Sequence, residues 1–199
     1  SLTALCNLSC PYCCPDSHEP PGLLTIAQRV RLVEAFVALG GHTLRLTGGE
    51  PLLYPDLEAL IRALQPLRHS GSSSALQDIA LTTNGVLLTK QRALQLRDAG
   101  LDRITLSLDG TTASSVSRMA GLKGGDAAGQ MVLNKVLSAI EHARAAGFDP
   151  HQGQIKLNAV MTKSGNADQL IGLAALARER GPELRLIEFM DVGNRNGWN

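Results

Sequence analysis

The sequence predicts an α/β fold, a partial (β/α)6 barrel of parallel strands with helices on the outside. Two observations predict this fold. First, apolar strand-like segments alternate with amphipathic helical segments along the chain, an order that implies a parallel sheet with right-handed crossovers. Second, several of these strands are polar on one face, whereas strands covered on both faces are almost wholly apolar. An open doubly wound sheet fits the element order equally well, and the polar faces favour a barrel with a wet lumen.

Six strands are predicted. The first is a short apolar segment that runs straight into a cysteine-rich loop, and the second alternates apolar and polar residues with the period of a strand. The later strands carry leucine, isoleucine and alanine on one face and end in polar side chains. The predicted strands are residues 2–5, 43–47, 78–83, 103–108, 154–161 and 184–190.

Five helices are predicted between the strands. The first opens with the capping box Thr25-Ile-Ala-Gln28 and ends at Gly40. The second begins at a Pro-Asp-Leu stretch, and each of the last three ends at a glycine. The glycine-rich stretch 111–129 is expected to be a loop with one weak helical turn. The predicted helices are residues 25–39, 55–67, 91–99, 131–146 and 168–180.

Length and composition restrict the class of protein. The chain has 199 residues, 44% of them hydrophobic, which suits one domain with a sizeable core and excludes a disordered segment. No apolar run reaches the roughly 18 residues of a membrane span, and a net charge of +1 argues against a nucleic-acid binder. Both ends look cut, so we expect residues 1–199 to be a single core domain, truncated at both ends, of a longer cytoplasmic protein.

Four cysteines lie within nine residues, at Cys6, Cys10, Cys13 and Cys14. A disulfide framework would spread its cysteines along the chain, so this clustering predicts metal or cluster ligation in a reducing cytoplasm. Three thiolates can hold three corners of a [4Fe–4S] cluster and leave one iron open to a small molecule. Four thiolates can also bind zinc, in which case the chain would be a non-catalytic metal-binding module.

The other residues that could bind a ligand are polar side chains on the predicted strands or at their carboxyl ends. Because the carboxyl ends of parallel barrel strands meet at one mouth, the polar residues there are expected to surround a single site. Lys156 is the most informative of them, since a lysine inside an apolar strand is costly unless its ammonium is paired, and a hydrated anion site would pair it. Arg45 occupies a similar position on its own strand.

Seven motifs follow one another along the chain. They are Cys6-x3-Cys10-x2-Cys13, Arg45-Leu-Thr-Gly-Gly-Glu-Pro-Leu52, Thr82-Thr-Asn-Gly85, Ser107-Leu-Asp109, Lys156-Leu-Asn158, Ile187-Glu-Phe-Met190 and Asn194-x-Asn-Gly-Trp198. The cysteine spacing, with an aromatic residue before the third cysteine, is similar to the signature of all radical S-adenosylmethionine (SAM) enzymes. Together with the strand-end motifs, it resembles the GTP 3′,8-cyclase family of these enzymes.

The resemblance implies a radical SAM core that converts GTP to (8S)-3′,8-cyclo-7,8-dihydroguanosine 5′-triphosphate, the first step of molybdenum cofactor biosynthesis. A 5′-deoxyadenosyl radical from SAM would abstract the ribose 3′ hydrogen. The residues implied to hold the [4Fe–4S] cluster are Cys6, Cys10 and Cys13. Those implied to contact SAM are Tyr12, Gly48, Gly49, Glu50, Ser107, Asn158 and Met190. Those implied to contact GTP are Arg45, Thr82, Lys156 and Arg185.

The sequence departs from the family pattern at several points. Thr43 and Tyr54 replace basic residues that are usual there, and Cys14 is an extra cysteine that we interpret as a bystander. The family's second [4Fe–4S] cluster, which binds guanine, is expected in a C-terminal region that this sequence lacks, so the chain alone is expected to be inactive. The resemblance further implies an electron donor such as flavodoxin or ferredoxin, the next enzyme of the pathway as a partner, and a possible homodimer, without nucleic-acid or membrane partners. Another radical SAM enzyme, acting on a peptide or a tetrapyrrole, is the alternative enzyme.

Overall fold

The computed structural model describes residues 1–13, 18–68 and 75–190, and in these residues the strands form one parallel sheet. The sheet order is β1-β2-β3-β4-β5, the same as the order along the chain. A doubly wound sheet reverses its strand order at a switch point, whereas a barrel does not, so the order confirms the partial barrel. The strands are β1 (Thr43–Leu46), β2 (Asp78–Thr83), β3 (Arg103–Ser107), β4 (Ile155–Met161) and β5 (Glu183–Glu188).

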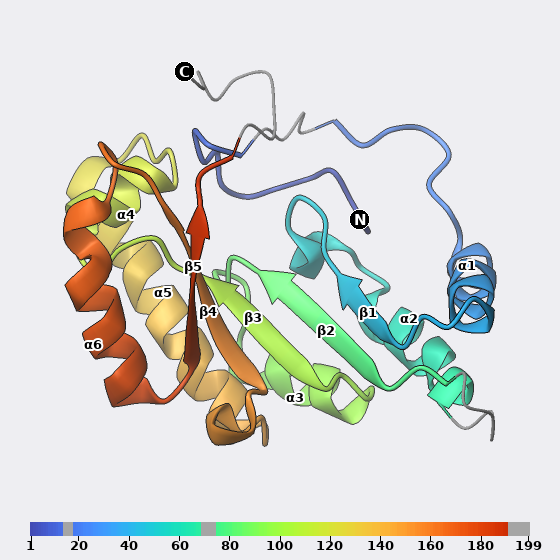
Figure 1. The fold of residues 1–199 in the computed structure, drawn as a ribbon. Coiled ribbons are helices and arrows are strands. Elements are labelled where there is room, and N and C mark those ends of the chain that lie inside the picture. The colour runs from blue at the N-terminus through green and yellow to red at the C-terminus, as the bar shows by residue number, and fades with distance from the viewer. Residues whose placement is uncertain (14–17, 69–74, 191–199) are drawn as a thin grey trace.

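Helices cover only the outer face of the sheet and leave the inner, lumen face open (Figure 1). The apolar side chains on the outer strand faces are fully buried beneath them, among them Ile104, Leu106 and Leu157. The predicted capping box at Thr25 is confirmed, because its hydroxyl accepts from the Gln28 amide while the Gln28 side chain accepts from the Thr25 amide. The helices are α1 (Ile26–Ala38), α2 (Leu57–Leu64), α3 (Lys90–Asp98), α4 (Ala113–Met119), α5 (Gly125–Ala145) and α6 (Leu170–Arg180).

The lumen face carries rows of polar side chains, as the strand pattern predicted. One row crosses the sheet through Thr82, Thr105, Lys156 and Glu183, which are neighbours in register on β2 to β5. Side chains alternate between the two faces of a strand, so this row faces away from the helices and toward the lumen. The register therefore explains why polar residues interrupt otherwise apolar strands.

The predicted first strand is wrong, since residues 2–5 form an extended segment outside the sheet. The segment bonds to the loop that follows β1 and not to the length of the strand. The Leu2 amide donates to the Thr47 carbonyl at 2.6 Å, the Gly49 amide to Thr3 at 2.8 Å and the Glu50 amide to Leu5 at 2.7 Å. The segment is therefore placed against the mouth of the barrel.

The predicted loop at residues 111–129 is also wrong. It contains α4 and the first five residues of α5. The glycine at 129 allows the two helices to touch, because a Cβ there would lie 1.9 Å from the Ala113 carbonyl oxygen. Within the described residues, no helix is long and apolar enough to cross a membrane.

Candidate functional site

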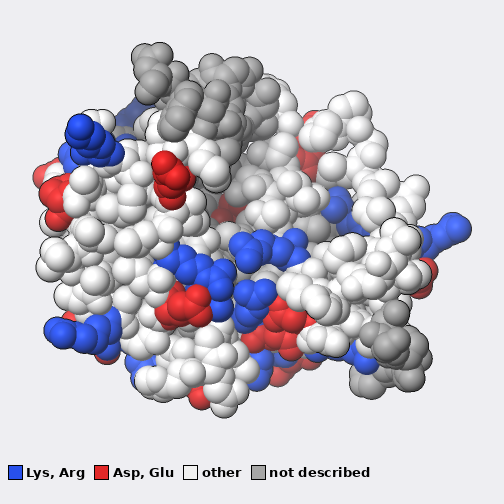
Figure 2. Space-filling model, in the orientation of Figure 1, with Lys and Arg blue, Asp and Glu red and all other residues white. Residues whose placement is uncertain are grey.

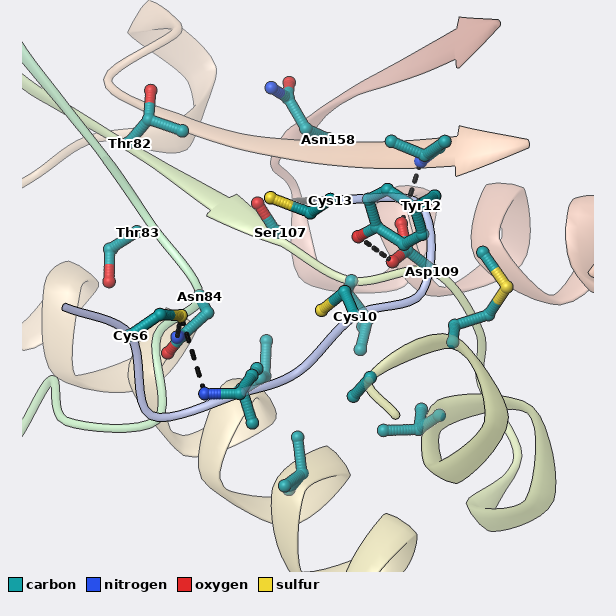
Figure 3. Close-up of a pocket in the computed structure, with 18 of the residues that line it drawn as sticks. Cys6, Cys10, Tyr12, Cys13, Thr82, Thr83, Asn84, Ser107, Asp109 and Asn158 are labelled. Atoms are coloured by element: carbon teal, nitrogen blue, oxygen red, sulfur yellow. Dashed lines mark hydrogen bonds between the residues drawn. The ribbon is translucent and has the colours of Figure 1, made fainter. Parts of the chain in front are cut away.

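A cavity of about 210 Å³ opens at the carboxyl ends of the strands, bounded by the cysteine loop on one side. The sulfur atoms of Cys6, Cys10 and Cys13 point into the space between the loop and the strand ends (Figure 3). Among the described residues, no three Cys, His, Asp or Glu side chains lie close enough together to hold a single ion. The thiols lie instead around a shared space, an arrangement that suits a larger multi-iron cluster.

Hydrogen bonds to three other parts of the chain hold the cysteine loop over the cavity. The Tyr12 hydroxyl donates to Asp109 Oδ2 at 2.6 Å, and Asp109 Oδ1 accepts from the Val160 amide at 2.8 Å (Figure 3). The Asn84 side-chain amide donates to Asn7 Oδ1 at 2.8 Å. The Ser9 amide donates to the Ala120 carbonyl at 3.3 Å, beyond the end of α4. Side chains at the ends of β2 and β3 thus fix the position of the loop.

The loop after β1 supports the segment that leads into the cysteines. A Cβ on Gly49 would lie 2.3 Å from the Leu5 carbonyl oxygen, and one on Gly48 would lie 2.6 Å from that of Thr3. Both glycines are therefore required for the close approach of residues 3–5. Thr3 and Ala4 also donate to the Glu19 carboxylate, at 2.9 and 2.7 Å.

The Glu50 carboxylate is fully buried and is already hydrogen-bonded within the protein. It accepts from the Leu52 amide at 2.9 Å, the Thr83 hydroxyl at 2.6 Å and the Asn84 amide at 2.8 Å. Burial raises its pKa, and these three hydrogen bonds oppose the rise. Its side chain therefore ties the loop after β1 to the end of β2, and its role toward SAM stays a prediction.

The electrostatics of the cavity favour protonated thiols when no cation is bound. Burial raises the pKa of Cys10 to about 12, helped by the nearby Asp109 carboxylate, and burial likewise raises the pKa of Cys6. Iron binds the thiolate form, so ligation has to release these protons. Three convergent thiols in a half-enclosed pocket are a donor set that fits a [4Fe–4S] cluster.

Two polar atoms in the cavity lining are buried and have no protein partner. They are Thr82 Oγ1 and Asn158 Oδ1, on β2 and β4. A buried polar atom without a hydrogen bond is costly, and such atoms in a cavity indicate where a ligand or water bonds. Thr105 Oγ1, between them on β3, is buried and unpartnered too.

The structure brings eight of the predicted site residues to this cavity and leaves six outside its lining. Those in the lining are Cys6, Cys10, Tyr12, Cys13, Gly49, Thr82, Ser107 and Asn158. Those outside it are Gly48, Glu50, Met190, Arg45, Lys156 and Arg185. Cys14 and the Asn194–Trp198 tail lie outside the described residues.

The predicted GTP-binding cations lie on the lumen faces of β1, β4 and β5, with Lys156 two residues before Asn158 and Arg185 beside Asn158 in register. Lys156 Nζ donates to Glu183 Oε2 at 2.8 Å, and Arg185 Nε donates to Glu183 Oε1 at 2.7 Å. The Lys156 ammonium thus has a protein partner, which sequence reasoning did not identify. Tyr54 is buried beneath the Arg29 guanidinium, at 5.1 Å from the ring centre.

Sequence reasoning also left four polar cavity residues out of the site, namely Thr47, Thr83, Asn84 and Asp109. Asp109 and Asn84 are polar residues at strand ends, a signal that was visible but is shared by ordinary turns. Thr47 ends the second predicted strand and lines the cavity beside Gly49. Nothing in the sequence signalled Asn166, whose buried side-chain amide donates to the carbonyls of Asp109 and Val160 at 2.7 and 2.8 Å.

The chain is similar in sequence to one protein family and to curated proteins of known activity. A family model described as the Radical SAM superfamily matches residues 1–177. GTP 3′,8-cyclase of Synechococcus sp. (strain CC9902) is 60% identical over 199 residues, which are all of this chain and 56% of the relative. GTP 3′,8-cyclase of Acidothermus cellulolyticus is 42% identical over 206 residues, again across the whole chain and 52% of the relative. The chain thus spans about half the length of these curated relatives.

A likeness to a solved structure supports the fold. SuiB of Streptococcus suis bound to S-adenosylmethionine aligns with a TM-score of 0.76, covering 98% of this chain and 40% of SuiB. The sequence identity is 19%, so this likeness shows the architecture alone.

Proposed function

This chain belongs to the radical SAM superfamily, and we propose that it is the barrel part of a GTP 3′,8-cyclase, the enzyme that begins molybdenum cofactor biosynthesis. The observation that carries the proposal is the cavity in which three cysteine thiols face the polar ends of β2, β3 and β4. Identity of 60% with a cyclase along the whole chain supports the choice of substrate. Because the chain spans about half of that relative, the activity belongs to the larger protein.

Cys6, Cys10 and Cys13 would hold the [4Fe–4S] cluster. When bound, such a cluster supplies the electron that cleaves SAM reductively and so starts the abstraction of the ribose 3′ hydrogen. The chain itself would bind and orient SAM: Asn158 Oδ1, which is buried without a protein partner, would accept a hydrogen bond from it. The other proposed SAM contacts are Tyr12, Gly48, Gly49, Glu50, Ser107 and Met190. The Glu50 carboxylate already bonds to Thr83 and Asn84, so residues 48–50 would contact SAM through their backbone.

GTP would extend from the cavity into the lumen. Thr82 lies at the boundary, with its unpartnered hydroxyl in the cavity lining. Lys156 precedes Asn158 by two residues on β4, which is about 7 Å along a strand. A nucleotide with its ribose at the cavity would direct its phosphates toward Lys156 and Arg185, and toward Arg45 on β1. Four proposed contacts, three of them cationic, suit a triphosphate.

The larger protein would contribute the remaining parts of the reaction. We place the second [4Fe–4S] cluster, which binds guanine, outside residues 1–199. An electron donor such as flavodoxin or ferredoxin would reduce the first cluster, and the next enzyme of the pathway would take the product. We propose that the protein is cytoplasmic, and a homodimer is compatible with the proposal.

The test is a reconstitution of the full-length protein that contains this chain. Anaerobic loading with iron and sulfide, followed by SAM, a reductant and GTP, should yield 5′-deoxyadenosine and cyclised GTP in step. Deuterium at the ribose 3′ position should appear in the 5′-deoxyadenosine. Cys10→Ala should lose iron and both products, whereas Cys14→Ala should keep them.

Two results would redirect the assignment. Production of 5′-deoxyadenosine without any change in GTP would favour a radical SAM enzyme with a peptide or tetrapyrrole substrate. A colourless protein that binds zinc and shows no response to SAM would instead favour the non-catalytic metal-binding module.

A further inference from the structure

Glu183, the first residue of β5, bonds to two of the cations that face the lumen. Its two carboxylate oxygens are shared between two strands: Oε2 accepts from Lys156 Nζ on β4 at 2.8 Å, and Oε1 accepts from Arg185 Nε on β5 at 2.7 Å. The side chain is 45% exposed, whereas that of Lys156 is 12% exposed. The Glu183 side chain is thus nearly half exposed, whereas the Lys156 side chain is largely enclosed.

The surroundings of Glu183 are predominantly positive. The hydrogen bond from Lys156, followed by that from Arg185, lowers the pKa of Glu183, so the carboxylate is ionised at neutral pH. Arg103 on β3 also lies within electrostatic reach, although its guanidinium is engaged by Asp78 at 2.6 to 2.9 Å. Figure 2 shows Lys and Arg side chains gathered across this open face, with acidic groups beside them.

A carboxylate that bridges two cations accepts hydrogen bonds from both of them, as a phosphate group would. Cations that face each other in an empty lumen repel, and an ionised carboxylate between them removes this cost. When a polyanion enters, however, the same carboxylate lies next to like charge, and the repulsion rises with each phosphate on the ligand. Glu183 therefore favours the empty lumen and disfavours the filled one.

We propose that Glu183 is an internal counter-anion that the polyphosphate chain of the substrate displaces from Lys156 and Arg185. This inference rests on the proposed function for the identity of the substrate. On this proposal, Glu183 lowers the affinity of the lumen for the nucleotide and so allows the nucleotide to leave. The neighbouring cations, Lys156 and Arg185, raise that affinity. The carboxylate holds both cations in position until phosphate oxygens of the ligand replace it as their hydrogen-bond acceptor.

The test is Glu183→Gln in the full-length protein, with binding of GTP, GDP and GMP measured by anaerobic calorimetry. We expect GTP to bind about five- to fiftyfold more tightly, with a smaller gain for GDP and the smallest for GMP, because the removed repulsion scales with ligand charge. Without ligand, the melting temperature should fall, since the two cations lose their ionised partner. Glu183→Ala should show the same order of gains.

Glu141→Gln is the matched control. Glu141 on α5 also bridges two arginines, Arg180 at 3.0 Å and Arg144 at 3.6 Å, and its side chain is 46% exposed, but it lies outside the lumen. Removal of its charge should leave all three nucleotide affinities unchanged. Equal gains in both variants would attribute the effect to net charge and overturn the proposal.

Three other results would also reject the counter-anion. Unchanged GTP affinity in Glu183→Gln would make the pair an ordinary ion pair, and weaker binding would make Glu183 a positioning group for the cations. Failure of both Glu183 variants to fold would show that the carboxylate cannot be displaced. Inorganic tripolyphosphate separates this proposal from the cyclase assignment: its tighter binding to Glu183→Gln would support the counter-anion even if the wild-type protein made no cyclised GTP.

Discussion

At the scale of single residues, the bond between Tyr12 and Asp109 offers a direct test of how the cysteine loop is held. The two residues are 97 positions apart, and their side chains meet at 2.6 Å. Tyr12→Phe and Asp109→Asn should each lower the free energy of unfolding, and a double-mutant cycle should give a coupling of about 1–3 kcal/mol. Urea unfolding measures the coupling, and iron per chain after reconstitution should fall in both variants. Additive effects would show that the bond does not hold the loop.

Lys156 provides a second residue-scale prediction, on substrate binding. Lys156→Ala in the full-length protein should weaken GTP binding about 10- to 100-fold, because an ammonium–phosphate contact is lost. Cluster assembly and SAM cleavage without GTP should stay near wild type, since Lys156 lies outside the lining of the cysteine cavity. Calorimetry and 5′-deoxyadenosine yield measure the two effects. Lys163→Ala, at an exposed position beyond β4, is the control.

Individual residues were predictable from sequence where chemistry and strand position coincide. Thr82, Ser107 and Asn158 reach one cavity because the carboxyl ends of parallel strands meet. Partners were not predictable, since Glu183 meets Lys156 only through the register of β4 and β5. A strand pattern states which face a residue occupies, but not which residue of the next strand lies opposite.

At the scale of elements, Gly49 decides how closely the segment before the cysteines approaches the loop after β1. Gly49→Ala places a methyl group 2.3 Å from the Leu5 carbonyl oxygen, so the backbone has to shift. We expect a loss of about 1–3 kcal/mol in unfolding free energy and less iron per chain. Gly41→Ala is the matched control, because the nearest atoms to its methyl group belong to the half-exposed Phe36 ring, which can turn away. Similar losses in both variants would contradict this role.

Two elements escaped sequence reasoning for physical reasons. The glycines at residues 111–129 predict a loop, because glycine disfavours helices on average. Gly129 nevertheless lies in α5, at a point where α4 leaves no room for a Cβ. Residues 2–5 have the apolar pattern of a strand, but their hydrogen bonds go to the turn after β1. The contacts between helices and the partners of backbone hydrogen bonds depend on the tertiary structure, which a local sequence pattern does not specify.

At the scale of the whole molecule, the site is assembled from both ends of the described chain. The cysteine segment at the N-terminus lies across the mouth and meets the loop after β1 and the residues that follow β3 and α4, while Glu183 and Arg185 come from β5 (Figure 1). The parallel sheet and its helices were predictable from the alternation of strands and helices, and the polar strand faces favoured the barrel over a doubly wound sheet. The position of the N-terminal segment was not, because it depends on contacts with α1 and Glu19.

Arg29 on α1 gives the whole-molecule prediction, since it fastens the N-terminal segment to the barrel. Its guanidinium donates to the carbonyls of Leu24, Ser1 and Leu2 at 2.9, 3.2 and 3.1 Å and lies over the Tyr54 ring. Arg29→Met keeps the apolar stem but loses these bonds, so unfolding free energy should fall by about 2–4 kcal/mol. Hydrogen exchange should accelerate in residues 1–13 and not in β3 or β4.

The matched control for Arg29→Met is Arg31→Met, two residues along the same helix and exposed to solvent. It removes the same charge from α1 but no contact to the N-terminal segment, so exchange and iron content should stay at the wild-type level. If the two variants exchanged alike, the segment would be held by Glu19 and the glycine turn alone. If Arg29→Met accelerated exchange across the whole sheet, Arg29 would stabilise the barrel itself, and the mouth would not behave as a separate unit.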